Sequence, residues 1–116
     1  MKNNWHFQYC SLNRTIDGDS LVLDVKTGFY HTAEVHVRLL GVDTPDRNKD
    51  PEGWRMSRAY TDNWLAESGG LTFTCTGADK YGRRWLGVIR NTLGESLGDA
   101  LINSGLGVVY VGGKKP

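Results

Sequence analysis

One arginine and two aspartates lie in a short segment whose spacing brings a cation close to two anions. Residues 38–46 read RLLGVDTPD, so Arg38 is followed by Asp43 and then by Asp46. Carboxylate oxygens are the ligands that hard cations such as calcium prefer. Taken in isolation, the segment also fits a strand end with a solvated turn and an Arg–Asp ion pair. The rest of the chain has to decide between these two interpretations.

A β-strand is expected to carry these side chains to the rim of a sheet. Residues 35–39 alternate between apolar and polar side chains, which places Arg38 on the face opposite Leu39. Pro45 cannot donate to a β-ladder, so the strand is expected to end near Asp43. The carboxylate of Asp43 then projects from the rim.

The composition favours one small domain built from short strands. The 116 residues include 15 glycines and only 3 prolines, and 39% of them are apolar. This suits a single domain over residues 1–116 with strands joined by tight turns. The net charge of +1 excludes a protein that holds nucleic acid by bulk positive charge, so such a role needs a local site. Cys10 and Cys75 lack metal-ligand spacing and are expected to be free thiols, or a disulfide if their strands are neighbours.

Periodicity predicts five strands and two helices. Strands are expected over residues 5–16, 21–25, 33–42, 71–76 and 83–90, with a last extended piece over 106–111. Exposed connections are expected over 27–32 and 47–53. A helix is expected over 54–67, with Met56, Tyr60 and Trp64 on one face, and a short helix follows a capping pattern at Ser96. A helix between the third and fourth of five strands is typical of an OB-fold barrel, so the predicted class is mainly β with helices (α+β).

Three motifs in this order make the sequence resemble the staphylococcal nuclease family, also called thermonucleases. The motifs are DGDS at 17–20, RLLGVDTPD at 38–46 and DKYGR at 79–83. The resemblance extends from about residue 14 to about residue 111 and includes the spacing of the strands and helices. It implies an OB barrel and an enzyme that hydrolyses phosphodiester bonds in DNA or RNA with calcium. The products implied by the family carry a 3′-phosphate and a 5′-hydroxyl.

The resemblance also implies roles for individual residues. Asp19 and Asp43 are expected to bind calcium through their carboxylates, and Thr44 through its backbone carbonyl. This oxygen-only ligation agrees with the size and hardness of calcium. Arg38 and Arg83 are expected to bind the scissile phosphate, where two guanidinium groups can donate paired hydrogen bonds to the charge that develops in the transition state.

The general base implied by the resemblance falls on Asp46, where the family commonly has glutamate. Aspartate is one methylene shorter, so its carboxylate is expected about 1.5 Å further from the same water. This departure puts the rate in doubt and supports an alternative function. The alternative is a noncatalytic OB-fold module that binds nucleic acid through a decayed nuclease site. A third reading is a protein-interaction domain with an exposed apolar patch.

Three further residues are weaker candidates for substrate binding. Tyr110 falls near the place where the family has aromatic residues beside its nucleotide pocket. Lys80 and Arg84 could face a nucleic-acid backbone, and solvated cations are an equal alternative.

The family also carries a C-terminal helix that this sequence lacks, because the chain stops at Lys114-Lys115-Pro116. Lower stability or a compensating dimer contact is expected, so the partners are a DNA or RNA substrate and, at most, a weakly bound second copy. No stretch approaches the roughly 18 apolar residues of a membrane span. The first residues lack the apolar run of a signal peptide, which favours the cytoplasm, or secretion if a leader had been removed.

Overall fold

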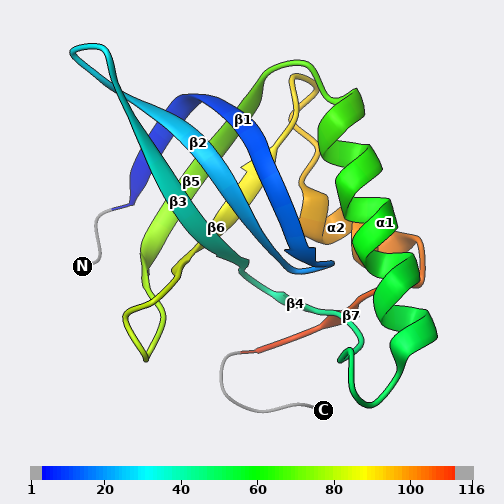
Figure 1. Ribbon diagram of the computed structural model, residues 1–116. Coiled ribbons are helices and arrows are strands. Elements are labelled where there is room, and N and C mark those ends of the chain that lie inside the picture. Colours follow the sequence, from blue (N-terminus) through cyan, green and yellow to red (C-terminus); the bar gives the residue numbers. More distant parts are fainter. Residues whose placement is uncertain (1–3, 112–116) are drawn as a thin grey trace.

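The computed structural model describes residues 4–111, in which five strands close into a barrel (Figure 1). The order around the barrel is β1-β2-β3-β6-β5, and β5 returns to β1. The strands span Trp5–Asp17 (β1), Ser20–Gly28 (β2), His31–Leu39 (β3), Leu71–Ala78 (β5) and Trp85–Arg90 (β6). Neighbouring strands are antiparallel except β3 and β6, which are parallel. The predicted class is therefore confirmed as an OB-fold-like barrel, mainly β with helices.

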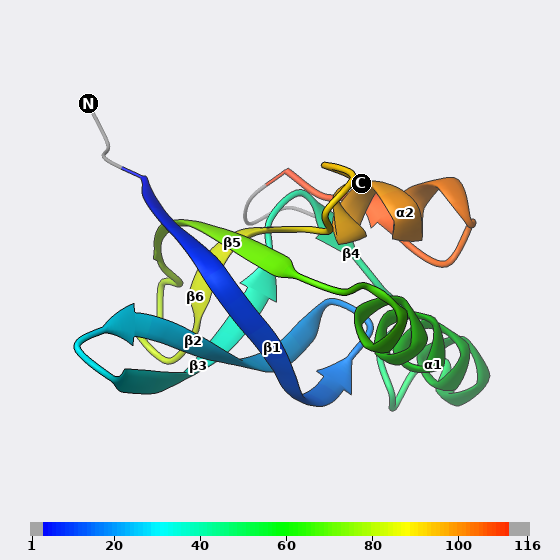
Figure 2. The same cartoon turned by 90° about the horizontal axis from the view of Figure 1, so that it is seen from above.

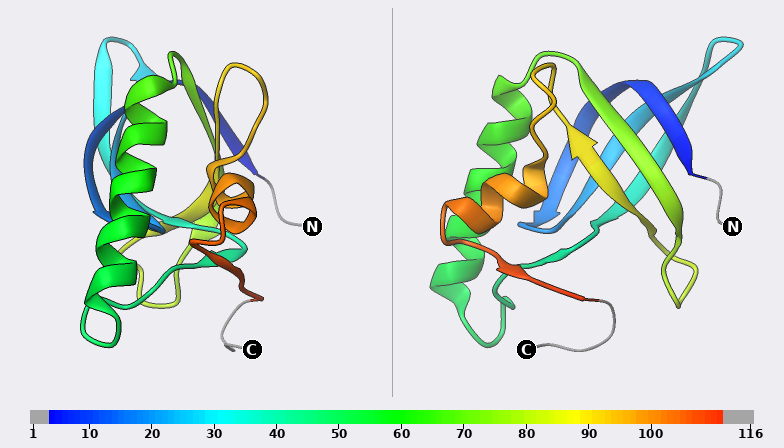
Figure 3. Two further views of the ribbon diagram at one scale, coloured as in Figure 1. Left: turned by 90° about the vertical axis from the view of Figure 1, so that its right-hand side faces the viewer. Right: turned by 180° about the vertical axis from the view of Figure 1, so that it is seen from behind.

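Two helices and a small two-stranded sheet complete the described part of the chain. The helices span Pro51–Glu67 (α1) and Leu97–Asn103 (α2), and Val42–Asp43 (β4) pairs with Val108–Val109 (β7). Figures 2 and 3 show α1 beside one end of the barrel, whereas the β2–β3 hairpin projects beyond the other end. Neither helix has the length and apolar character that a membrane span requires.

Strand alternation fills the barrel with apolar side chains. The buried residues of the four strands β2, β3, β5 and β6 include Leu21, Leu23, Val25, Val37, Leu39, Leu71, Phe73, Cys75 and Ile89. Every second residue of these strands thus points inward, and Arg38 lies between two buried positions of β3 and points away from the core. The predicted orientation of Arg38 is confirmed.

The connection predicted over 27–32 is wrong, because it is a two-residue turn. Phe29 and Tyr30 form that turn with φ angles of 54° and 63°, and β2 and β3 continue on both sides of it. The strands can extend this far because a turn with two left-handed residues matches the twist of a hairpin.

Other predicted strand ends are shifted as well, and two of these shifts lie close to the predicted site residues. β3 ends at Leu39 because Gly41, with a φ of 83°, turns the chain before β4. β6 begins at Trp85, so Arg83 and Arg84 belong to the β5–β6 turn and not to a strand. Residues 114–116, on which the expected absence of a C-terminal helix rests, lie outside the described residues.

Helix α1 begins at Pro51, three residues before its predicted start. The Asp50 carboxylate accepts a hydrogen bond from the Gly53 backbone N–H at 3.0 Å, which caps the helix, and proline is pre-organised for a first helical position. The exposed loop predicted through residue 53 therefore ends at Asp50.

The predicted face of α1 is correct for Tyr60 and Trp64, which are partly buried against the core, and wrong for Met56. Ser57, Thr61 and Leu65 are the buried residues of the helix, whereas Met56 is 53% exposed. The Thr61 hydroxyl donates to the Gly18 carbonyl at 2.6 Å. Small polar side chains are needed here because the helix packs against the backbone of the β1–β2 turn.

Cys10 and Cys75 are separate free thiols, although they lie on the neighbouring strands β1 and β5. The register places Cys75 opposite Trp5 and Cys10 opposite Leu71. Burial raises the pKa of the Cys10 thiol to about 11. This thiol is therefore protonated at neutral pH and behaves as a small apolar side chain.

Replacement of Gly87 tests how tightly the barrel is packed beside Arg38. Gly87 lies opposite Leu39 in the parallel pairing, and an added Cβ would collide with the Thr74 carbonyl oxygen and the Phe73 ring. Gly87→Ala should lower the free energy of unfolding by about 1–3 kcal/mol, measured by urea denaturation. The control is Gly69→Ala, where an added Cβ meets nothing within 4 Å. Equal stability of the two variants would contradict this packing.

Candidate functional site

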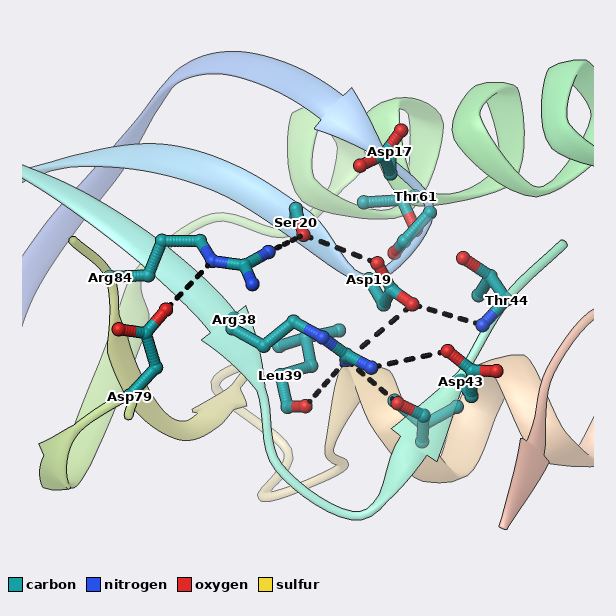
Figure 4. A network of polar contacts seen from close by, with 12 residues as sticks. Asp17, Asp19, Ser20, Arg38, Leu39, Asp43, Thr44, Thr61, Asp79 and Arg84 are labelled. Carbon is teal, nitrogen blue, oxygen red and sulfur yellow. Dashed lines mark hydrogen bonds and ion pairs between the residues drawn. The ribbon is translucent and has the colours of Figure 1, made fainter. Parts of the chain in front are cut away.

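The main predicted site residues meet in a depression of about 270 Å³ at the rim of the barrel. Its walls come from the β1–β2 turn, the end of β3, the segment after β4 and the β5–β6 turn (Figure 4). The charged residues that line it are Asp17, Asp19, Arg38, Asp43, Asp46, Arg47 and Arg84. Segments far apart in the sequence thus supply one polar site.

Asp19 is held in place by the backbone and by a neighbouring hydroxyl. Its residue is 7% exposed, and one carboxylate oxygen accepts the Thr44 backbone N–H at 3.0 Å. The other oxygen accepts the Ser20 hydroxyl at 3.2 Å. Glycine precedes Asp19 because a Cβ at Gly18 would come within 2.8 Å of a side chain of α1. The turn therefore packs directly on the helix and fixes the carboxylate.

The guanidinium of Arg38 joins the two predicted calcium-ligand carboxylates. Its Nη1 atom lies 3.5 Å from Asp19 Oδ2, and its Nη2 donates to Asp43 Oδ1 at 3.2 Å. Nη1 also donates to the carbonyl oxygens of Leu39 at 2.9 Å and Val42 at 2.8 Å. The side chain is only 14% exposed. Arg38 thus neutralises two carboxylates and fastens the end of β3 to β4.

Thr44 forms the inner corner of the depression. It is 7% exposed, and its Oγ1 atom is buried without a hydrogen-bond partner among the described residues. A buried hydroxyl without a partner is costly. This corner therefore offers a polar atom to water, an ion or a ligand oxygen.

Asp46 lies on the exposed side of the same depression. Its Oδ1 atom accepts the backbone N–H groups of Asn48 at 2.7 Å and Lys49 at 3.4 Å. This Asx turn holds the carboxylate close to the loop that leads into α1. Asp46 thus belongs to the predicted group, with its position set by local backbone bonds.

The two adjacent arginines of the third motif have different positions. Arg84 lines the depression and donates to Ser20 Oγ at 3.2 Å, so Ser20 links it to the Asp19 carboxylate (Figure 4). Arg83 is exposed and lines a neighbouring depression with His36, and Arg84 borders both. Arg84, which the sequence analysis gave only a weak role in substrate binding, is thus the arginine that lies beside Arg38 and Asp19.

Tyr110 and Lys80 also have different relations to the site. The Arg38 guanidinium carbon lies 5.5 Å from the centroid of the Tyr110 ring, and the Tyr110 backbone N–H donates to the Gly41 carbonyl. Lys80 is exposed in the β5–β6 turn and lies over the Tyr81 ring. Tyr110 is therefore beside the site, whereas Lys80 belongs to the turn.

The donor atoms of the depression suit calcium better than a softer metal. Among residues 4–111 no group of three His, Cys, Asp or Glu side chains is close enough to hold a metal by itself. Asp19 and Asp43 supply two carboxylates to the depression, and among the described residues no cysteine or histidine lines it. Calcium accepts such a partial shell because it also binds waters and ligand oxygens.

Two supporting residues carried no assigned role in the sequence analysis. Ser20 connects Arg84 to Asp19, and the Asp79 carboxylate accepts Arg84 Nε at 3.1 Å. Both residues lie inside the motifs named in the sequence analysis. The Asp-x-x-Gly pattern at Asp79 is typical of a turn in which the aspartate accepts backbone hydrogen bonds, so the structural role of Asp79 could have been predicted. A further hydrogen bond is donated by Trp54 Nε1 to the Asp17 carboxylate at 2.6 Å. This bond could not be inferred from the sequence, because it joins two elements that are far apart along the chain.

Comparison with known proteins adds no relative. No protein-family profile matches the sequence, and no curated protein gives a significant match to it.

The carboxyl of Asp79 should titrate below the usual range. Partial burial raises its pKa, but the N–H groups of Arg83 and Tyr81 and the Arg84 guanidinium together hold it below the ordinary value of 3.8. Since the folded pKa is depressed, the stability that this carboxylate contributes is complete above pH 3.8 and is lost as pH falls through the folded pKa. Carbon-13 NMR of the Asp79 carboxyl measures this titration, and the Tyr81 and Arg83 amide signals should move with it. A midpoint above 3.8 would overturn the assignment.

Proposed function

We propose that the protein is a calcium-dependent nuclease that hydrolyses phosphodiester bonds in DNA or RNA. The observation that carries the proposal is the meeting of Asp19, Asp43 and Arg38 in one depression, with Asp46 at its exposed side. A site of this kind combines oxygen ligands for a hard cation with a guanidinium for a phosphate. It also supports the resemblance of the three motifs to the staphylococcal nuclease family.

Asp19 and Asp43, with the Thr44 carbonyl, are the proposed calcium ligands. When bound, calcium supplies positive charge that draws the phosphate into the depression and stabilises the charge of the transition state. The buried Thr44 hydroxyl, which has no hydrogen-bond partner among the described residues, lies at the same corner and favours a polar ligand there. Arg38 already lies between the two carboxylates, so it is positioned to meet the phosphate that binds beside them.

Two guanidinium groups are proposed to contact the phosphate. Arg38 is the first, and its side chain is pre-organised by the carbonyl oxygens of Leu39 and Val42. Arg84 is the geometrically favoured second, because it lines the depression and is fixed by Ser20 and Asp79. The family resemblance instead assigns this role to Arg83. The choice between the two arginines is open to direct measurement.

Asp46 is the proposed general base. It removes a proton from the attacking water while the arginines hold the phosphate. The water oxygen bonds to phosphorus as the P–O5′ bond breaks, and the departing 5′ oxygen takes a proton from solvent, which gives the family's 3′-phosphate and 5′-hydroxyl products. Its Oδ1 atom accepts the two backbone N–H groups of the Asx turn. A short side chain with one oxygen held by the backbone favours a slow enzyme.

The alternative function is binding of single-stranded nucleic acid without cleavage. Two observations favour it, namely the Asx turn that holds Asp46 and the ion pairs that already neutralise Arg38. The retained carboxylates argue against it, because they would repel a phosphate backbone unless a cation is bound. The same experiment separates the two functions.

The first test is digestion of single-stranded DNA and RNA by the wild type and by Asp46→Asn. Asparagine retains an oxygen that can accept the Asn48 N–H, so the turn should persist while the base is removed. Cleavage should require millimolar calcium, stop with chelator and fall by roughly 10²–10⁴-fold in the variant. Arg38→Ala is a poorer choice, because two uncompensated carboxylates cost on the order of 3–5 kcal/mol of stability. Wild-type protein that shifts the substrate in a gel without cutting it would support the alternative.

The second test compares Arg84→Ala with Arg83→Ala under the same conditions. Loss of a pre-organised donor to the phosphate lowers kcat by roughly 10²–10³-fold, and this loss is expected for Arg84→Ala, while Arg83→Ala should stay close to the wild type. The adjacent substitution is a matched control, since both remove one positive charge from the same turn. The reverse pattern would move the role to Arg83, as the family resemblance implies.

A further inference from the structure

The tip of the β2–β3 hairpin carries two aromatic side chains in water. Phe29 and Tyr30, here called the aromatic tip, are 94% and 110% exposed. Figures 1 and 3 show this hairpin extending beyond the barrel on the side away from α1. Its rings therefore gain nothing from packing within the chain.

The turn at this tip does not favour aromatic residues either. Phe29 and Tyr30 both have positive φ angles, 54° and 63°, as in the type I′ turn for which Asn-Gly is preferred. Bulky residues are strained in this region of φ and ψ. Neither turn geometry nor core packing explains why two aromatic residues occupy this turn. A contact with another molecule is the remaining physical reason.

A cavity of about 350 Å³ opens at the same end of the barrel. We call it the barrel mouth, and its larger lining residues are Trp5, Phe7, Val25, Val35, Phe73 and Trp85. Among residues 4–111, no charged side chain lines it. An apolar cavity of roughly 150 Å³ is enough to hold a benzene ring, so the barrel mouth has room for an aromatic side chain.

We propose that the occupant of the barrel mouth is the aromatic tip of a second copy of this chain. The tip and the mouth lie at one end of the same molecule, so a two-fold axis places each tip against the partner's mouth. One association then makes the contact twice, which is the usual way a closed dimer forms. The net charge of +1 leaves little repulsion between copies.

Charge along the hairpin argues against nucleic acid as the occupant. On β2 and β3, Asp24 lies directly opposite Glu34, between the aromatic tip and the catalytic depression. Arg14 pairs with Glu34 at 3.4 Å, which leaves the strip without a positive excess. A phosphate backbone running from the depression to the tip would cross these carboxylates.

The dimer leaves the proposed catalytic site open. Strand β3 runs from His31 beside the tip to Leu39 beside the depression, so the two features lie at opposite ends of the strand. The inference therefore does not rest on the proposed function, and its test needs no activity measurement.

The test is sedimentation equilibrium of the wild type and of the double variant Phe29→Asn with Tyr30→Gly, over micromolar to millimolar concentrations. The substitutions install the residues that the turn prefers, so the hairpin should fold and the melting temperature should hold or rise. The wild type is expected to show a weak monomer–dimer equilibrium, because the contact is small, and the double variant to stay monomeric. A monomeric wild type, or an equally dimeric variant, would overturn the proposal.

A second variant makes the test specific for the mouth. Ala33 also lines it and is half-buried, so Ala33→Glu places a carboxylate where the partner's tip would enter. This variant should also be monomeric, and its circular dichroism melting curve verifies that it folds. A mixture of the two variants retains one intact tip and one intact mouth, so it should form a weaker heterodimer. A mixture that stays monomeric while both variants are folded would contradict the reciprocal contact.

Discussion

The bridge that Arg38 makes between Asp19 and Asp43 is the interaction on which the site depends. Two carboxylates this close, each less than one-fifth exposed, would repel each other without a cation between them. The guanidinium satisfies both and also binds two backbone carbonyl oxygens at the point where β3 gives way to β4. In the proposed function, calcium and a phosphate that bind here would exchange partners with this arginine.

The barrel supplies what that bridge requires. The parallel pairing of β3 with β6 sets Arg38 opposite Leu86, and the turn before β6 then brings Arg84 to the same rim. Helix α1 holds the β1–β2 turn through the Thr61 bond to Gly18. A rigid frame therefore carries the charged side chains of the depression on turns, and loops above a packed scaffold are a common position for binding groups.

The two ends of the barrel have opposite chemistry. The rim near Arg38 is charged and joined by hydrogen bonds, while the far end is apolar and aromatic. Because β2 and β3 connect them and the paired acidic residues Asp24 and Glu34 lie between, the two surfaces do not merge. One chain of 116 residues can thus hold a polar site and a self-association surface without either disturbing the other.

Residue type and spacing determined the strand periodicity, the class of fold and the inward face of β3, and the resemblance carried by the three motifs predicted the grouping of Asp19, Asp43 and Arg38. Periodicity misplaced the start of α1, whose Asp50 cap and Pro51 lie in a stretch that also reads as a loop. The tertiary structure alone decided which arginine reaches the depression, because the path of the β5–β6 turn depends on the Asp79 bonds. It also decided that Cys10 and Cys75 stay apart. Two cysteines on neighbouring strands can pair only if the register places them opposite each other, and register is set by contacts along the whole barrel.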